Sequence, residues 1–338
     1  MKRIDFCARS AALLAVAAFP PENLRAQSAQ LRVLLGSGDA QALPGGGFEF
    51  GGRQYRGTFS RGAGGDLINT LPVEEYLYSV VPREMAPSWP ATALQVQAIC
   101  SRTFVLRRID PGRPYDVVPS NLQQVYEGVA TESPSGRAAV DATAGQVLLY
   151  GDEVANVVYS SCCGGHTESA SDAWGGLSVP YLGGVVCPYC TQSPTYRWSR
   201  AFPLDAVAGA LHEGSAPESP LKSIQLGDRD ASGRVRSFTL AFESGATAIS
   251  ASDLRLALGA QDLPSLLIFA LSQDESETLH VVGGGSGHGV GLCQWGARGI
   301  ALADASVAAT LAFYFPGTRI AAWTSASPPP TTTNFPPR

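Results

Sequence analysis

The chain has 338 residues, 45% of them hydrophobic, which is enough to bury one large core or two smaller ones. Only 16% are charged and the formal net charge is −5, without a basic run or an acidic block, so neither a nucleic-acid partner nor a solvating tail is indicated. The 37 glycines and 24 prolines predict many turns rather than long helical repeats.

Residues 1–28 have the pattern of a secretory signal peptide. Lys2 and Arg3 provide a basic start, residues 11–19 form a short apolar run, and the small residues around Ala26 offer a cleavage site. The apolar run is too short to span a bilayer as an anchor. We therefore expect an exported protein, in the periplasm, the cell wall or the medium, with no membrane span after cleavage.

Helices and strands are intermixed along the rest of the chain. Strands are expected at residues 31–35, 48–50, 146–150, 154–160, 224–226, 235–242 and 278–282, the third and fourth forming a hairpin. Helices are expected from Pro72 to a stop at Pro82, at 91–108 with Ser88 as N-cap, at 251–258 capped by Ser250 or Ser252, and at 307–314.

The order of these elements has no βαβ rhythm, so the predicted fold class is α+β, with mixed helices and mostly antiparallel sheet around a substrate cleft. We expect one domain over residues 29–320, with its core at about 71–317. The Pro- and Thr-rich tail, residues 321–338, is expected to be disordered.

Glu84 stands in a turn between the first two predicted helices. It lies within the segment VPREM, residues 81–85, and Pro87 and Trp89 follow. An apolar setting raises the pKa of a carboxyl group, which suits a general acid near neutral pH. Taken alone, a glutamate in such a turn is more often a cap or a solvated residue.

Residues 159–169 (YSSCCGGHTES) form a second unusual segment, in which a strand ends in small and hydroxyl residues before a Gly-Gly turn. Ser161, His166 and Thr167 can donate and accept hydrogen bonds, as the lining of a polysaccharide cleft requires. The alternative is a polar hairpin turn in which His166 has only a local role.

Residues 283–297 (GGGSGHGVGLCQWGA) form the third, and their glycines let the backbone come close to itself or to a ligand. The segment is not a phosphate loop, because it lacks the Lys-Ser/Thr ending. His288, followed by Gln294 and Trp295, suggests a positioned polar group beside an aromatic sugar platform. The alternative is that the glycines only allow core strands to pack closely.

The cysteines that follow residue 28 are even in number, which in an exported chain points to disulfides. We expect at least one disulfide between the pair Cys162/Cys163 and the pair Cys187/Cys190. With His166 nearby the same group is compatible with zinc, but an oxidising compartment favours disulfides. The sequence analysis therefore assigns no metal site and no cofactor.

Together, the three segments resemble the SpoIID/LytB family, named after stage II sporulation protein D and the amidase modifier LytB. The matching stretches run in the family's order from about Leu71 to Gly317 and comprise LPVEEYLYSVVPREMAPSWP, VYEGVATES, YSSCCGGHTESASDAWGG, VVGGGSGHGVGLCQWGA and FYFPG. Each motif is modest by itself, and the series is specific.

The resemblance implies a peptidoglycan lytic transglycosylase that cuts glycan strands stripped of their stem peptides, and it places the catalytic glutamate on Glu84. The residues then expected to bind or orient the sugar are Tyr126, Ser161, His166, Thr167, His288 and Gln294. The expected partner is the glycan strand of peptidoglycan. LytB-type members are described as enhancers of a separate amidase, so a non-catalytic partner of a cell-wall amidase is the alternative.

Two departures from the family pattern stand out. Some clostridial members resemble zinc proteins with one His and two Cys ligands ahead of the VYxG segment, and residues 116–128 here contain neither residue type. Conversely, the cysteines at 162, 163, 187, 190 and 293 replace other residues of many members, which suggests a disulfide-stapled variant. The resemblance does not imply a role in sporulation, since the family also occurs in non-sporulating bacteria.

A single compelling carboxylate fits lytic transglycosylase chemistry better than hydrolysis, which needs two carboxylates. The carboxylic acid protonates the glycosidic oxygen and then accepts the proton of the C6 hydroxyl of the same N-acetylmuramic acid, which closes a 1,6-anhydro ring. A glycan hydrolase that uses water is a further alternative.

Overall fold

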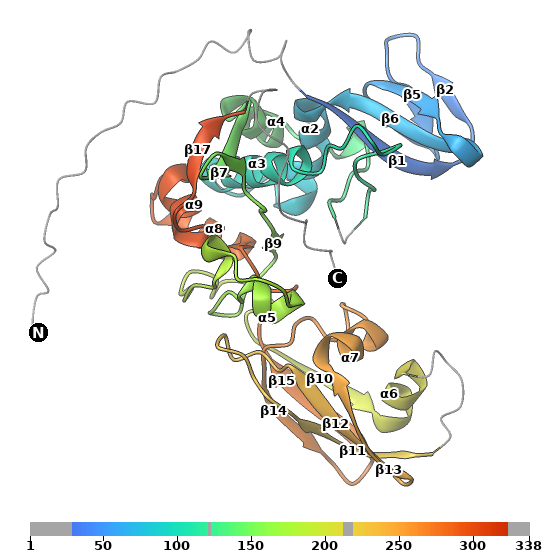
Figure 1. Cartoon of the computed structure of the whole chain (residues 1–338), viewed down its shortest axis with the longest axis vertical. Helices are drawn as coiled ribbons and strands as arrows, with labels where there is room; N and C mark the ends of the chain where they lie inside the picture. Colours follow the sequence, from blue (N-terminus) through green and yellow to red (C-terminus); the bar gives the residue numbers. More distant parts are fainter. Residues whose placement is uncertain (1–28, 121–122, 212–218, 324–338) are drawn as a thin grey trace, which may run out of the picture.

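The computed structural model describes residues 29–120, 123–211 and 219–323 (Figure 1). It confirms the α+β class, because helices are interspersed with small sheets whose strands pair mostly in antiparallel fashion. The predicted signal peptide and residues 324–338 of the predicted tail lie outside the described ranges. Within those ranges, no helix has both the length and the apolar character needed to cross a bilayer.

The chain begins with two small antiparallel sheets, which confirms the strands predicted at 31–35 and 48–50. The first has the order β1 (Gln30–Ser37), β6 (Asp66–Pro72), β5 (Thr58–Arg61). The second is a meander of β2 (Ala40–Ala42), β3 (Phe48–Phe50) and β4 (Arg53–Tyr55). Alternate residues of β1, Leu31 and Val33, are fully buried, as a strand with one covered face requires.

Strand β6 leads directly into a layer of packed helices: α2 (Val73–Glu84), α3 (Ala91–Leu106) and α4 (Pro134–Ala142). The buried residues of α2 include Tyr76, Leu77 and Val80, in agreement with the predicted apolar periodicity. Helix α3 lies so deep that Arg102 is only 1% exposed. Its guanidinium donates to both carboxylate oxygens of Glu74, at 2.8 and 2.6 Å, which compensates the buried charge.

Two predicted helix boundaries are wrong. Helix α2 continues through Pro82 to Glu84, because a proline in the last turn forfeits a single backbone hydrogen bond, and Met85 N still donates to Val81 O at 3.0 Å. Ser88 does not cap α3; the N-cap is Pro90, and no side chain caps this end. With both corrections, Glu84 is the last residue of a helix rather than part of the turn between two helices.

A third sheet packs against α3 through β7. Its strand order is β17 (Arg319–Ala322), β7 (Gln146–Tyr150), β8 (Glu153–Val154). The predicted hairpin is correct only to Val154. The chain then leaves this sheet, and β9 (Tyr159–Ser160) pairs in parallel with β16 (Leu292–Cys293). Residues 155–158 between them are buried but belong to no strand, so the hydrophobicity of this run reflects burial rather than a continuous strand.

Strand β16 passes directly into α8 (Gln294–Leu302), which was not predicted, and α9 (Val307–Tyr314) follows as predicted. The loop after β9 contains the short helix α5 (Ala170–Trp174). Single turns of 3-10 helix occur at Ala63–Gly65, Val129–Thr131 and Pro180–Leu182.

Residues 198–283 form a second unit with its own hydrophobic core (Figure 1). One of its sheets is β10 (Trp198–Pro203), β15 (Thr278–Gly283), β14 (Ile268–Gln273), and the other is β11 (Leu221–Leu226), β12 (Ser237–Phe242), β13 (Gly245–Ser250). Helices α6 (Leu204–Leu211) and α7 (Ala251–Leu258, capped by Ser250) pack on these sheets. The strands predicted near 224–226, 235–242 and 278–282 are confirmed.

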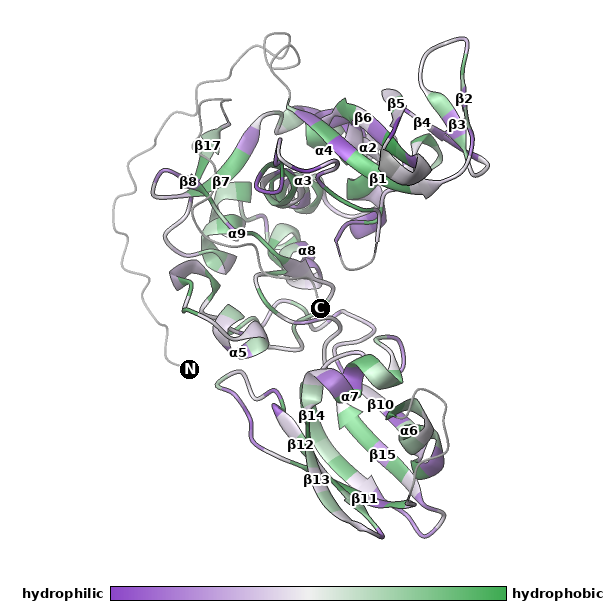
Figure 2. Cartoon of the chain, turned by 45° about the vertical axis from the view of Figure 1, so that its right-hand side comes forward, coloured by the Kyte–Doolittle hydropathy of each residue, from purple (hydrophilic) through white to green (hydrophobic). Residues whose placement is uncertain are grey.

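The second unit is an insertion, because the first core resumes at Val290 after the chain leaves β15. Figure 2 shows the two units joined through loops below α5, with hydrophobic residues concentrated along strands such as β15. The junction holds Arg234, whose guanidinium donates to the carbonyl oxygens of Cys163 and His166 at 2.9 and 3.0 Å.

Candidate active site around Glu84

Glu84 is the last residue of α2, and its carboxylate faces groups from distant parts of the chain. Gln294, the first residue of α8, donates from Nε2 to Glu84 Oε2 at 3.1 Å. Burial raises the pKa of Glu84 above that of an ordinary glutamate, while hydrogen bonds from Gln294, the Val125 amide and the Tyr159 hydroxyl oppose the rise. The net direction is upward, as a general acid requires.

A chain of buried side chains holds Gln294 in place. Its Nε2 also lies 3.3 Å from Gln97 Oε1, and Gln97 Nε2 donates to Ser101 Oγ at 2.9 Å. Gln97 and Ser101 are fully buried on α3, one turn apart, and Gln294 is 6% exposed. Because buried amides need partners, this chain orients the amide that contacts Glu84.

Two buried phenols lie near Glu84: the Tyr159 hydroxyl donates to its carboxylate, and the Tyr76 hydroxyl has no hydrogen-bond partner within the described part of the chain. Burial is the main cause that raises the pKa of both tyrosines well above the ordinary range, and the charge of Glu84 adds a smaller increase. Both phenols therefore stay protonated and can donate. Buried donors beside a carboxylate stabilise its charged form when it has lost its proton.

Two aromatic residues lie close in sequence to Glu84 and Gln294: Trp89 follows the end of α2, and Trp295 follows Gln294. The rings of Trp89 and Trp295 meet edge to face with centroids 4.9 Å apart, and Arg298 lies over them at 5.7 and 5.2 Å. Both indoles are partly exposed. Rings of this kind offer an apolar face and a polar edge, which is the character of the predicted sugar platform.

A pocket of about 550 Å³ is lined by residues that include Phe50, Arg53, Tyr55, Val125, Tyr126 and Glu127. Its wall is continuous with the site through Val125, whose amide supports the Glu84 carboxylate. Tyr126 lies mostly within the core, 2% exposed, and its hydroxyl donates to Asn69 Oδ1 at 2.8 Å. The hydroxyl is thus already used by the fold.

His288 is linked to the site through Tyr159 rather than by direct contact. Its Nε2 donates to the Tyr159 carbonyl oxygen at 2.9 Å, and its Nδ1 accepts from the Val290 amide at 3.0 Å. Burial lowers the pKa of His288 to about 4, so the ring is neutral at pH 7 and has one donor and one acceptor, both occupied. Its ring also packs on Trp174, with centroids 5.1 Å apart.

The remaining predicted residues, Ser161, His166 and Thr167, lie in the loop that follows β9 and make hydrogen bonds that fix its backbone. His166 Nδ1 is 2.6 Å from the Thr167 carbonyl oxygen, and Thr167 Oγ1 accepts from the Val185 amide at 2.7 Å. Ser161 accepts at its carbonyl oxygen from Trp295 N at 3.0 Å. The side chains of His166 and Thr167 thus make their hydrogen bonds within the loop rather than to Glu84.

The glycines of residues 283–297 pack against the segment 158–164. A Cβ at Gly287 would lie 2.7 Å from Ser160 Cβ, one at Gly285 would lie 2.8 Å from Cys162 O, and one at Gly291 would strike Val158 O. Close backbone packing, offered above as the alternative, is therefore one role of these glycines. It also delivers Gln294 to Glu84.

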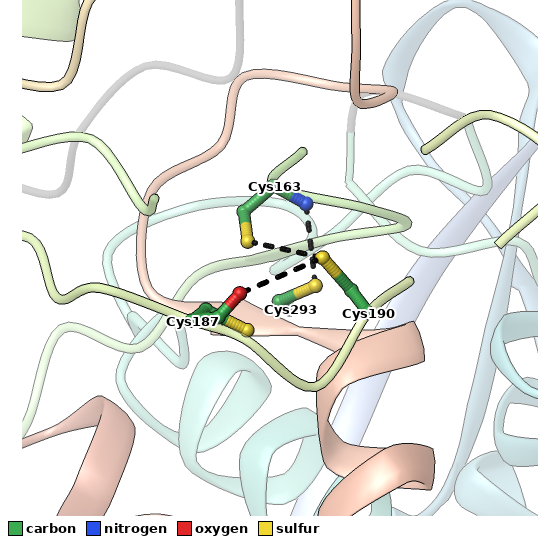
Figure 3. A group of neighbouring side chains, drawn as sticks. All are labelled: Cys163, Cys187, Cys190 and Cys293. Carbon is green, nitrogen blue, oxygen red and sulfur yellow. Dashed lines mark hydrogen bonds between the residues drawn. The ribbon is translucent and has the colours of Figure 1, made fainter. Parts of the chain in front are cut away.

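The predicted disulfide is not formed: the six cysteines of the described ranges are free. Instead of pairing, the sulfurs of Cys163, Cys187, Cys190 and Cys293 gather in one group, all within 4.8 Å of one another (Figure 3). The disulfide prediction is wrong because it used only cysteines close in sequence, whereas the fold places Cys293, from a distant segment, beside the other three. Cys293 directly precedes Gln294.

Comparison with known proteins identifies the family of the chain. A profile described as SpoIID, Stage II sporulation protein, matches residues 61–150, which include Glu84. An uncharacterised protein of Brachyspira hyodysenteriae is 34% identical over 280 residues, covering 81% of this chain and 74% of that protein. The chain belongs to the SpoIID family.

Characterised names occur among the more distant members of the SpoIID family. Stage II sporulation protein D of Bacillus subtilis is 26% identical over 273 residues, 75% of each chain. The amidase enhancer of the same organism is 26% identical over 295 residues, 73% of this chain but only 40% of that protein. A second profile, a domain of unknown function (DUF8618), matches residues 189–291, which include the inserted unit.

Four polar groups around the carboxylate or its partner Gln294 were not predicted from the sequence: Gln97, Ser101, Tyr76 and Tyr159. One signal was available for two of them: Gln97 and Ser101 are polar residues four apart within the apolar run of α3. Such a pair in a buried helix needs a polar partner.

Proposed function

We propose that this SpoIID-family protein is an exported peptidoglycan lytic transglycosylase with Glu84 as its acid and base. One observation chiefly supports this function: Glu84, a partly buried glutamate of raised pKa, accepts a hydrogen bond from Gln294 of a distant segment. The groups that most influence this carboxyl are an amide, a peptide N–H, a phenol and a guanidinium. A single carboxylate with such neighbours suits chemistry in which the substrate supplies the nucleophile.

In the proposed reaction the neutral Glu84 acid donates its proton to the glycosidic oxygen between N-acetylmuramic acid and N-acetylglucosamine. The C1–O bond breaks, and the muramic C6 oxygen attacks C1 while Glu84, now a carboxylate, accepts the C6 hydroxyl proton. The products are a free N-acetylglucosamine end and a 1,6-anhydro end, and Glu84 returns to its acid form. The Tyr159 hydroxyl supports the carboxylate that develops on Glu84, and the buried Tyr76 hydroxyl is a second donor close to that charge.

We propose three functional segments along the chain. Residues 1–28 act as the signal peptide, 29–320 form the mature catalytic domain including the inserted unit, and 321–338 are a tail. Among the residues predicted to bind sugar, Gln294 has the strongest support, because it contacts Glu84. We expect His288, Ser161, His166 and Thr167 to shape the cleft through the backbone, and Tyr126 to form part of the pocket wall.

A second function, a non-catalytic peptidoglycan-binding enhancer of a cell-wall amidase, is supported by the similarity to the Bacillus subtilis amidase enhancer. One experiment separates it from the first. The mature protein is incubated with peptide-stripped glycan strands, and the new ends are analysed by mass spectrometry. Ends lighter than reducing ends by one water support the transglycosylase; reducing ends indicate a hydrolase; uncut strands with stimulated amidase activity indicate the enhancer.

A further inference from the structure

Four cysteines from three separate segments place their sulfurs around one point (Figure 3). Cys163 follows β9, Cys187 and Cys190 lie in the loop after α5, and Cys293 ends β16. All four are fully buried. A disulfide joins sulfurs in pairs, whereas here each sulfur lies within 4.8 Å of the other three.

The spacing fits tetrahedral zinc. With a Zn–S bond of about 2.3 Å, the sulfurs of a regular tetrahedron are about 3.8 Å apart. The Sγ atoms of Cys163 and Cys190 are 3.7 Å apart. A disulfide needs about 2.05 Å, so closing one would disrupt the group. Cys187-Pro-Tyr-Cys190 also has the C-x-x-C spacing found in structural zinc sites.

Polar groups of the fold face two of the four sulfurs. Cys293 is the N-cap of α8, and its Sγ accepts from the Gly296 and Cys163 amides at 3.3 and 3.2 Å. The Tyr314 hydroxyl lies 3.2 Å from Cys187 Sγ. Backbone amides at a helix N-terminus, together with a phenol, offset negative charge on the sulfurs, as outer partners of metal ligands do.

The thiol of Cys162 is also a neighbour of Cys190 and Cys293, but it does not belong to the set whose sulfurs are all within 4.8 Å of one another. Cys100 lies elsewhere, buried in α3. These two residues therefore provide matched controls of the same chemical type.

We propose that Cys163, Cys187, Cys190 and Cys293 bind one structural zinc ion in tetrahedral thiolate coordination. The four protein ligands complete the coordination shell, so the ion has no open position and does not act on substrate. It joins the loops after β9 and α5 to the start of α8. Since Gln294 follows Cys293 directly, the ion also anchors the residue that contacts Glu84.

The test begins with the mature protein purified from the exported fraction without chelator. Elemental analysis is expected to find one zinc per chain, and replacement of the metal by cobalt(II) should give the visible absorption of a tetrahedral thiolate site. Iron in place of zinc would overturn the assignment of the metal. Metal-free protein, either with free thiols or with a disulfide found by non-reducing peptide mapping, would overturn the site.

Variants then test the ligands. Cys187→Ala/Cys190→Ala should lose at least nine-tenths of the bound zinc, while Cys162→Ala and Cys100→Ala each retain one equivalent. Loss of zinc from Cys162→Ala, or its retention in the double variant, would contradict the proposed ligand set. If the double variant does not fold, the wild type decides: a chelator that removes zinc should lower its Tm, and added zinc should restore it.

Discussion

At the scale of single residues, the important pair is Glu84 and Gln294, which come from distant parts of the chain. Gln294 Nε2 donates a hydrogen bond of 3.1 Å to Glu84 Oε2. Burial and hydrogen bonding act on Glu84 in opposite directions, and burial is the larger effect. The carboxyl is thereby kept protonated to a higher pH than an exposed glutamate. The activity should then decline as the pH rises through this raised pKa.

Glu84→Gln should reduce glycan cleavage by at least about 10²–10⁴-fold, the usual contribution of a general acid or base. The change keeps the shape and removes only the proton transfer, so the thermal stability should stay within a few degrees of wild type. Anhydro ends are counted by mass spectrometry. Glu75→Gln, on the same helix, is the matched control and should cleave normally; cleavage by Glu84→Gln at the control's rate would refute the assignment.

Gln294→Ala should change the pH dependence as well as the rate. The Gln294 amide lowers the pKa of Glu84, so its loss should move the alkaline limb of the pH–rate profile to higher pH. Loss of a hydrogen bond to a charged group should lower kcat about 10–100-fold. A slower variant with an unmoved limb would show that Gln294 supports only the fold.

At the scale of elements, the segment 283–297 packs closely against the chain around β9 because glycines stand at the points of closest approach. Gly291 has φ +71° and lies against the carbonyl of Val158, just before the β9–β16 pairing. Both the left-handed backbone and the close approach require glycine. The same packing directs α8 toward Glu84.

Gly291→Ala should destabilise the protein by about 2–5 kcal/mol, the sum of a left-handed alanine and a forced contact in a packed core. Gly151→Ala is the control: it has φ +59° but open space around it, and should cost only about 1–2 kcal/mol. Urea unfolding of both variants measures the difference. Equal losses would mean that the close approach at Gly291 has no energetic weight.

At the scale of the whole molecule, two cores meet at a buried charged junction. Arg234 of the inserted unit lies 3.4 Å from Glu168 of the first unit, and both side chains are less than one-tenth exposed. Burial raises the pKa of Glu168 to about 8, although Arg234 opposes the rise. Glu168 is therefore largely protonated in the folded protein at pH 7 but ionised in the unfolded chain.

Stability should consequently fall as the pH rises from about 4.5, where the unfolded chain begins to ionise, to about 8, where the folded protein does. Within that window this residue costs up to about 1.4 kcal/mol per pH unit. Glu168→Gln mimics the protonated acid and should flatten the slope. Urea unfolding at pH 5, 6.5 and 8 measures both proteins; parallel curves would contradict the raised pKa.

The sequence by itself determined the α+β class and most strands and helices through local apolar periodicity, and motifs read in series singled out Glu84 as the proposed acid. Tertiary structure decided the partners. No local pattern shows that Gln97 and Ser101 support Gln294, that Cys293 completes a group of four sulfurs, or that residues 198–283 enclose a second core. Those contacts arise where segments distant in sequence meet, and burial and hydrogen bonding depend on that meeting rather than on neighbours along the chain.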